Sequence, residues 1–360
     1  MKTASFITIH VGLNFGSKLQ TIATSEILKR LGFDTICINY VPPRVTNKRY
    51  WENALSSPVR LLRKIIFFPL RYKATRNFDN YLAKFCKLST PIYAESNFIN
   101  LCPKTDLYVS GSDQLWNYEH NEGIDRHYFF DGIEGNKIAY ASSIGMTSLP
   151  DGYAKYIKEQ LSKYRAVSVR EHSAVDILEN INVKAQQVLD PTFMLSKEDW
   201  KKFASRRLVK EDYIFVYLPY NIKDKVLVYR SVRKIANEKR LKVVTYSDYM
   251  FRESLADRTV YFVNPGDILS LILHANVVVT NSFHGTAFSI NLNKQFWTYM
   301  PSHFSTRITS ILDLCGLGNR LLNVDISDKQ INEVIDYNYT NEVLDQERQK
   351  TIDFLTKALQ

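Results

Sequence analysis

Residues 276–288, NVVVTNSFHGTAF, decide the fold that this sequence predicts. The three consecutive valines indicate a buried, parallel β-strand. Gly285 and Thr286 then open an apolar run, residues 287–292, which predicts a helix. Peptide N–H groups in the first turn of a helix favour anions, and open α/β sheets bind ligands at the carboxyl ends of their strands. We therefore expect an anion-binding site beside His284.

His284 lies where the predicted strand, turn and helix meet. A turn histidine that only hydrogen-bonds to the backbone would also explain this residue. A structural turn, however, does not require an imidazole beside a glycine at the start of a helix, whereas anion chemistry gains from one. We favour an acid–base role for His284.

Length and composition indicate a globular protein with two domains. The chain has 360 residues, 45% of them hydrophobic and 23% charged, which is enough for two α/β domains with separate cores. The N-terminus leads directly into a predicted strand, residues 4–10, and no apolar run approaches the ~20 residues of a membrane-spanning helix. We expect a cytoplasmic protein.

The cysteines suggest neither a metal site nor a disulfide framework. The chain has four of them, with no C-x-x-C pair: Cys37, Cys86, Cys102 and Cys315. Buried free thiols are the expectation for such a pattern. We expect no metal and no cofactor.

The net charge of +10 is concentrated in an insertion, residues 44–104, which holds twelve basic residues and three acidic ones. Within it, residues 58–69 read PVRLLRKIIFFP, an amphipathic helical pattern flanked by arginine and lysine. Basic amphipathic helices bind anionic membrane surfaces. A solvated helix packed on its own domain is the alternative. We expect no nucleic-acid partner, because no nucleic-acid-binding motif accompanies the charge.

Polar residues follow three further predicted strands. After the first strand, Asn14 and Gln20 are expected to point into the crevice, while Ser17 caps the next helix. The turn lacks the GxGxxG spacing of a dinucleotide site. After the strand at residues 107–109, Gly111 allows close backbone approach and Asp113 begins a polar loop.

In that loop, Asp113 and Asn117 are expected to hold hydroxyls, and Trp116 to stack on a sugar face. An Asx-turn is the alternative for Asp113. After the strand at residues 166–169 comes Arg170, whose guanidinium suits a carboxylate or a phosphate. An ion pair to Glu171 or another acid is the alternative for Arg170.

The order of elements predicts an α/β fold with two Rossmann-like domains facing across a cleft, a GT-B-like arrangement. We place the first domain, the acceptor side, at residues 1–195, with its basic helical insertion at 44–104. Residues 196–212 are the expected linker, 213–326 the donor-side domain, and 327–360 a C-terminal helical segment broken near residues 337–340.

In their order along the chain, these landmarks resemble the polysaccharide pyruvyl transferase family. The matching motifs are N-x-G-S-x-x-Q at 14–20, G-S-D-Q-x-W-N at 111–117, S-V-R-E at 168–171, D-P-T at 190–192, S-F-H-G at 282–285, and the segment from Arg307 to Arg320. Many members have arginine at the position of Ser282, so Arg170 and Arg307 are candidates to supply that charge here.

The resemblance implies pyruvyl transfer from phosphoenolpyruvate to a sugar of a bacterial-type surface polysaccharide or its lipid-linked precursor, forming a ketal. It implies catalytic roles for His284, Arg170 and Asp113. The implied donor-binding residues are Arg170, Ser282, Phe283, Gly285, Thr286 and Arg307. The implied acceptor-binding residues are Asn14, Gly16, Ser17, Gln20, Gly111, Ser112, Trp116, Asn117 and Glu171.

The residue types suit this chemistry, since phosphoenolpyruvate carries up to three negative charges and calls for arginines and a helix N-terminus. Two alternatives stay open on the sequence: a GT-B glycosyltransferase that uses a nucleotide sugar, and a non-catalytic carbohydrate-binding protein. The expected partners are phosphoenolpyruvate, an oligosaccharide acceptor and an anionic membrane surface.

Overall fold

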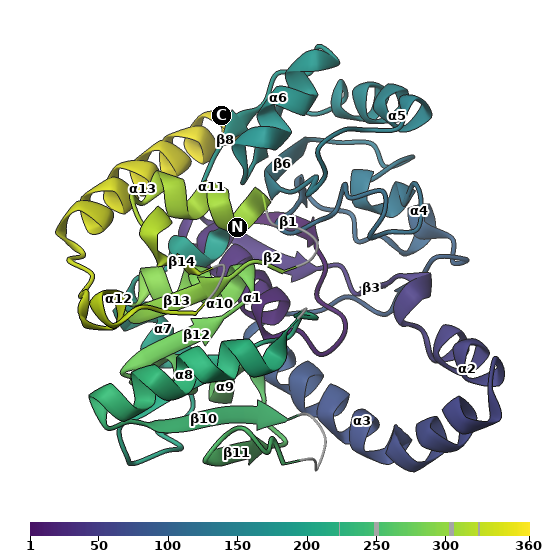
Figure 1. The fold of residues 1–360 in the computed structure, drawn as a ribbon. Helices are drawn as coiled ribbons and strands as arrows, with labels where there is room; N and C mark the ends of the chain where they lie inside the picture. The colour runs from purple at the N-terminus through teal and green to yellow at the C-terminus, as the bar shows by residue number, and fades with distance from the viewer. Residues whose placement is uncertain (223, 248–251, 302–305, 323–324) are drawn as a thin grey trace. The chain divides into compact units, whose positions relative to one another are not determined.

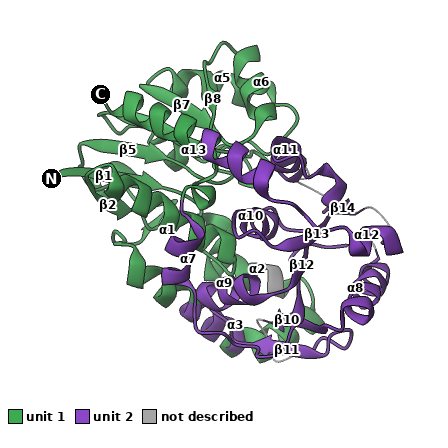
Figure 2. Ribbon diagram, turned by 90° about the vertical axis from the view of Figure 1, so that its left-hand side faces the viewer, with its two compact units in different colours: residues 1–69, 78–194, 347–360 green, residues 70–77, 195–346 purple. Residues whose placement is uncertain are grey.

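The computed structural model describes residues 1–222, 224–247, 252–301, 306–322 and 325–360, with the backbone alone for Asn53 and Ala54. The chain forms two compact units (Figure 2). Unit 1 comprises residues 1–69, 78–194 and 347–360, and unit 2 comprises residues 70–77 and 195–346.

Unit 1 is built on a six-stranded parallel sheet in the order β2-β1-β5-β6-β7-β8. Its strands are β1 Lys2–Ile7, β2 Phe33–Cys37, β5 Leu107–Ser110, β6 Lys137–Ser142, β7 Ala166–Val169 and β8 Gln186–Gln187, with a separate parallel pair of β3 Tyr40–Val41 and β4 Ile92–Tyr93. Its helices are α1 Phe15–Arg30, α2 Asn47–Leu55, α3 Pro58–Phe85, α4 Phe98–Leu101, α5 Asp151–Leu161 and α6 His172–Asn180, with 3₁₀ turns η1 Pro43–Val45, η2 Arg126–Phe129 and η3 Pro191–Phe193.

Unit 2 is a second six-stranded parallel sheet, in the order β11-β10-β9-β12-β13-β14. Its strands are β9 Tyr213–Tyr217, β10 Lys242–Ser247, β11 Arg258–Tyr261, β12 Val277–Thr280, β13 Gln295–Tyr299 and β14 Leu321–Leu322. Its helices are α7 Lys197–Phe203, α8 Lys225–Lys239, α9 Pro265–His274, α10 Phe283–Asn291, α11 Thr306–Leu314 and α12 Asp328–Asn332, with η4 Gly318–Arg320; α13 Asn338–Leu359 closes the chain (Figure 1).

The strand order defines where each unit should bind a ligand. In unit 2 the first strand, β9, lies beside the fourth, β12, which is the Rossmann order with its crevice between those two strand ends. In unit 1 the sheet reverses between β1 and β5. These are the strand ends that carry the motifs at residues 14–20, 111–117 and 282–285. The predicted α/β fold with two Rossmann-like parallel sheets is confirmed.

The structure corrects the predicted start of the helix after β12. The helix begins at Phe283, four residues before the predicted position, because the Ser282 hydroxyl accepts a hydrogen bond from Gly285 N at 3.4 Å and caps it. His284 therefore lies in the first helical turn and not in a preceding turn.

The basic insertion is helical, as predicted, but its second helix is longer than the predicted segment. Helix α3 continues through Pro69 to Phe85. Its last part is held by an apolar face, with Ala74, Phe78 and Leu82 all buried at helical spacing. Burial of that face offsets the backbone hydrogen bond that an interior proline removes.

The boundaries of the units differ from the predicted domain limits. The expected linker, residues 196–212, contains α7, whose capping box joins Ser196 and Asp199, and it belongs to unit 2. The C-terminal segment is broken between α12 and α13, as expected, but residues 347–360 belong to unit 1. There Leu355 is buried in the core beside β1 and β2, and Thr351 accepts a hydrogen bond from Leu189 N at 3.1 Å.

The four cysteines are buried free thiols, as predicted. Burial raises the pKa of Cys86 and of Cys102 to about 12. Among the described residues, no helix is long and apolar enough to cross a membrane.

Candidate functional site

The end of β12 and the start of α10 form the candidate site of unit 2. A Cβ on Gly285 would lie 2.3 Å from Thr280 Oγ1, so only glycine lets the helix pack this closely on the strand end. Thr286 is fully buried, and its hydroxyl donates to Ser282 O at 3.0 Å and pairs with Thr298 Oγ1 at 3.0 Å. Gly285 and Thr286 thus fix the helix, while Ser282 caps it.

At the start of α10, His284 and Arg307 both lie near the Phe283 ring. The Phe283 and His284 rings have centroids 5.1 Å apart, and the Arg307 guanidinium carbon lies 5.6 Å from the Phe283 ring centroid. Both His284 and Arg307 are largely buried, at 5% exposure. The start of α10 therefore has an imidazole and a guanidinium nearby, as a site for a carboxylate or phosphate requires.

Asn281, which the sequence did not single out, connects the two strand ends of this crevice. Its side-chain amide donates to Tyr220 O at 2.9 Å and accepts from Tyr220 N at 3.4 Å. The loop after β9 is thereby held at the end of β12. In the sequence, the indication was an asparagine placed directly after the predicted valine strand and before Ser282.

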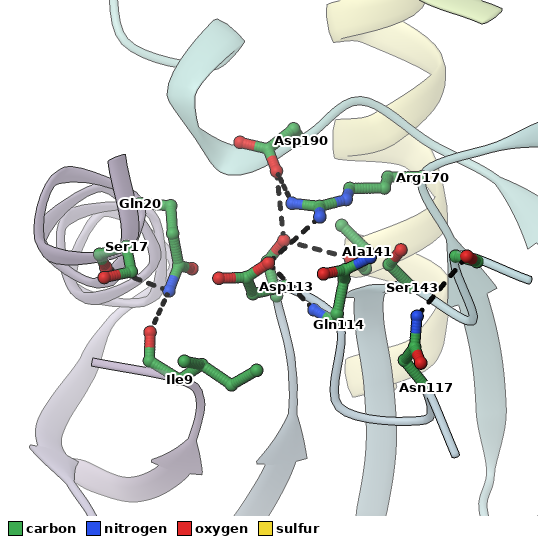
Figure 3. A network of polar contacts seen from close by, with 12 residues as sticks. Ile9, Ser17, Gln20, Asp113, Gln114, Asn117, Ala141, Ser143, Arg170 and Asp190 are labelled. Carbon is green, nitrogen blue, oxygen red and sulfur yellow. Dashed lines mark hydrogen bonds and ion pairs between the residues drawn. The ribbon is translucent and has the colours of Figure 1, made fainter. Parts of the chain in front are cut away.

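In unit 1, Arg170 is the centre of a buried ionic network (Figure 3). Its guanidinium donates to Asp113 Oδ1 at 3.0 Å and to Asp190 Oδ2 at 2.7 Å, and its Nε lies 3.9 Å from Glu171 Oε2. Burial alone would lower the pKa of Arg170, but Asp113 and Asp190 reverse that effect and the pKa is raised. The arginine is firmly charged.

The expected donor-binding and catalytic roles of Arg170 and the catalytic role of Asp113 stay predictions, and in the structure Arg170 is paired with protein carboxylates. The Arg170 side chain is 1% exposed, and the carboxylates of Asp113, Asp190 and Glu171 lie 3.0, 2.7 and 3.9 Å from it. The ion pair that the sequence left open for Arg170 is the one observed, although its main partners are Asp113 and Asp190.

Glu171 organises the loop after β6. Its buried Oε1 accepts hydrogen bonds from Ser143 Oγ at 2.8 Å, Ile144 N at 2.9 Å and Gly145 N at 3.0 Å. A Cβ on Gly145 would lie 2.4 Å from Gln114 Nε2 and 3.0 Å from Asn117 Nδ2. Glu171, Gln114 and Asn117 therefore meet around Gly145.

Gln114 is a candidate ligand contact that the sequence did not single out. Its Nε2 is buried and has no hydrogen-bond partner among the described residues. A buried donor of this kind calls for a water or a ligand atom. Asn117, by contrast, is engaged on both sides, donating to Gly145 O at 3.3 Å and accepting from His120 N at 2.8 Å.

Trp116 does not offer the sugar-stacking face that the sequence suggested. It is fully buried, and its ring stacks on Phe129 with centroids 5.8 Å apart. Gly111 makes a close backbone approach, but to the protein and not to a ligand, since a Cβ there would lie 2.0 Å from Tyr140 O. Ser112 donates to Ala141 O at 3.0 Å and to Asp190 Oδ2 at 3.2 Å.

The residues after β1 also hold each other in place (Figure 3). Asn14 caps α1 by accepting from Ser17 N at 3.2 Å, the role expected of Ser17. Gln20 is fully buried and donates to Thr8 Oγ1 at 2.7 Å, and Thr8 donates to Ser112 O at 2.7 Å. Gly16 is buried in the first turn of α1. Hydrogen bonds thus join the segments that follow β1 and β5, while Gln20 Oε1 is buried with no hydrogen-bond partner among the described residues.

A family model for polysaccharide pyruvyl transferases matches residues 14–303 of the 360-residue chain. The chain belongs to the polysaccharide pyruvyl transferase family. A search of curated proteins found no match. Membership of this family makes the chain a transferase of polysaccharide modification.

Among solved structures, the chain is similar to HepE from Anabaena in complex with UDP and glucose, at 8% identity and a TM-score of 0.51, over 99% of this chain and 100% of that one. It is also similar to MnaA from S. aureus with UDP, at 10% identity and a TM-score of 0.51, over 97% and 89%. These likenesses show the GT-B type of fold.

Two histidine sites of unit 1 were missed by sequence reasoning. His127 Nδ1 lies 2.8 Å from Asp125 Oδ1, and Asp125 Oδ2 accepts from the Tyr40 hydroxyl at 2.7 Å. This is an imidazole oriented by a carboxylate. His10 is buried after β1 and lies 3.1 Å from Asn39 Oδ1 through its Nε2. The sequence carried no spacing signal for either pair.

A shallow hollow of about 600 Å³ lies at the other, amino-terminal edge of β7. It is lined by Arg165, Lys184, Phe354 and Lys357, among others. We do not assign the active site there, because it lies away from the polar residues that follow the strand ends. In the described parts of the chain, no three His, Cys, Asp or Glu side chains are placed to hold a metal ion.

Gly285→Ala should destabilise the protein by about 1–3 kcal/mol, because the added methyl group meets the Thr280 side chain. Adding Thr280→Ala should recover most of the loss, since it removes the clashing atoms. Gly152→Ala in α5, where a Cβ meets nothing within 4 Å, is the control. Thermal unfolding measures all three. A neutral Gly285→Ala would contradict the close packing described here.

Arg170→Ala should lower the free energy of unfolding by about 3–5 kcal/mol, because it leaves buried carboxylates without their cation. The exposed Arg165→Ala should change it by less than about 0.5 kcal/mol. Denaturant unfolding tests both. If Arg170→Ala kept full stability and lost only binding of phosphoenolpyruvate, Arg170 would be a donor contact after all.

His10 should make stability depend on pH. Burial, and to a lesser extent Lys18, lowers the pKa of His10 below its usual value near 6.5. The unfolded chain therefore binds the proton more readily, and stability should decrease as the pH falls below about 6.5. His10→Asn should flatten that part of the profile between about pH 7 and pH 5 in thermal unfolding. Parallel profiles for the two proteins would contradict the pKa assignment.

Proposed function

We propose that the chain transfers a pyruvyl group from phosphoenolpyruvate to two hydroxyls of one sugar, in a bacterial-type surface polysaccharide or its lipid-linked precursor. The product is a cyclic ketal, and phosphate leaves. The observation that carries the proposal is the grouping of His284 and Arg307 around Phe283 at the start of α10. Family membership supports the reaction class.

In this proposal the donor binds in unit 2. The first turn of α10 and the Arg307 guanidinium attract the carboxylate and phosphate of phosphoenolpyruvate. Ser282 replaces the arginine common at this position in the family, so Arg307 supplies the charge. The pairing of Arg170 with carboxylates in unit 1 supports placing the anionic donor in unit 2.

His284 acts in this proposal as an acid and then as a base. His284 donates a proton to the methylene carbon of phosphoenolpyruvate, which becomes a methyl group, and an oxocarbenium-like centre forms at the neighbouring carbon. One sugar hydroxyl attacks that centre and its proton restores His284. The phosphate then leaves, the second hydroxyl closes the ring, and its proton goes to the phosphate. Acid–base catalysis of this kind contributes about 10²–10⁴-fold.

We propose that the acceptor is held by unit 1, around Gly145. The Gln114 amide is a buried donor there that a sugar hydroxyl would satisfy. Asn14, Ser17, Gln20, Ser112 and Asn117 are engaged in protein hydrogen bonds and shape this edge.

The test is incubation of the full chain with phosphoenolpyruvate and a panel of free and lipid-linked, galactose-containing acceptors. Phosphate release and a mass gain equal to one pyruvate ketal on the acceptor are expected. Stabilisation by UDP without any transfer from phosphoenolpyruvate would favour a nucleotide-sugar glycosyltransferase instead. No transfer across the panel would contradict the proposal.

His284→Gln should lower kcat for this transfer by about 10²–10⁴-fold, with a much smaller change in donor binding. His274→Gln is the matched control, because this histidine ends α9 and hydrogen-bonds to Ser270 O at 2.9 Å. Steady-state kinetics measure kcat and KM for phosphoenolpyruvate in both variants. Full activity in His284→Gln would remove His284 from the mechanism.

A further inference from the structure

Helices α2 and α3 follow one another along the chain (Figure 1). Their apolar side chains form two faces, one packed and one exposed. The inner face is packed: the Trp51 and Phe68 rings have centroids 5.2 Å apart, and Tyr50 meets Trp51 at 5.3 Å. Lys64 closes this contact, with its Nζ 4.4 Å from the Tyr50 ring centroid and donating to Tyr50 O. The helical pair is therefore held by its own aromatic core.

The outer face is uncovered. It is formed by large apolar side chains that are each between 53% and 76% exposed: Leu55, Val59, Leu62, Ile65 and Ile66. In α3, the residues at 59, 62 and 66 follow the i, i+3, i+7 spacing of one helix face. A continuous stripe of this kind on a surface helix marks an interaction site.

Basic residues surround the apolar stripe. Arg60 and Arg63 lie on α3 beside the exposed apolar residues, and Lys48 and Arg49 lie on α2. All four basic residues are exposed. Glu52 is the one acid between residues 44 and 78, and Arg49 pairs with Glu122 at 3.2 Å. The surface thus combines exposed aliphatic side chains with a strong positive charge.

We propose that this face, Leu55 to Pro69, docks on an anionic lipid bilayer, with the aliphatic stripe inserted among the headgroups and the arginines against the lipid phosphates. The charge selects this occupant over a second copy of the chain, because two copies would bring equal positive charges together. Amphipathic helices with a basic margin bind bilayers in this way, and each basic residue strengthens binding roughly fivefold. The proposal goes beyond the proposed reaction and does not depend on it.

The experiment is flotation of the full chain with vesicles of phosphatidylglycerol and phosphatidylcholine, compared with vesicles of phosphatidylcholine alone. Binding to the anionic vesicles is expected, and it should weaken as salt is added, since the charges are exposed. No binding to the anionic vesicles at low salt would overturn the proposal, whatever the activity of the enzyme.

Two variants locate the contact. Leu62→Ser with Ile66→Ser should weaken vesicle binding at least about tenfold, because both side chains lose their apolar contact with the bilayer. Arg60→Glu with Arg63→Glu should weaken it by at least as much and reduce the salt dependence. All four positions are exposed, so thermal unfolding should be unchanged.

The matched control is Val226→Ser with Val334→Ser, two aliphatic residues that are 62% and 70% exposed outside the α2–α3 pair. This control should bind vesicles as the wild type does. Equal weakening in the control would show non-specific adsorption and contradict the proposal. A wild-type dimer in sedimentation that Leu62→Ser with Ile66→Ser dissociates, without vesicle binding, would assign the face to self-association instead.

Discussion

The contact between Gly285 and Thr280 is the constraint on which the candidate site depends. It lets α10 start directly at the end of β12, under the Ser282 cap. In the first helical turn, the Phe283 ring then lies near both His284 and Arg307. A helix N-terminus, an imidazole and a guanidinium are thereby combined at the switch point of a Rossmann-type sheet, where an anionic donor would bind.

The two units differ in charge chemistry at their strand ends. In unit 1 a single buried arginine is shared by Asp113, Asp190 and Glu171. This cluster joins the loops after β5, β6 and β7, and its arginine is already paired with protein carboxylates. In unit 2 the basic group faces an aromatic ring and a helix start. On this contrast we base the proposal that the donor binds in unit 2 and the acceptor in unit 1.

Sequence patterns predicted the strands and the edge at which polar residues gather, because valine runs that stop in glycine and polar residues have few other structural solutions. These patterns did not predict which side chains within the chain contact one another. The sequence predicts that Arg170 binds an anion. In the structure, Asp190, twenty positions further along and just after β8, lies beside Arg170 and pairs with it. The sequence predicts that Trp116 stacks on a sugar, whereas in the structure its ring stacks on Phe129. Burial and long-range pairing determine the surroundings of both side chains, and local sequence spacing does not show them.

We propose that unit 2 holds a trianionic three-carbon donor through Arg307 and the start of α10. Calorimetric titration of the full chain with phosphoenolpyruvate, and separately with UDP, tests it most directly. We expect binding of phosphoenolpyruvate that Arg307→Gln weakens at least about tenfold, because a charge-assisted contact is lost. Arg233→Gln is the control and should leave binding unchanged, since Arg233 lies on α8 and pairs with Asp257 at 2.9 Å. Tight binding of UDP with none of phosphoenolpyruvate, or equal affinity in Arg307→Gln, would contradict it.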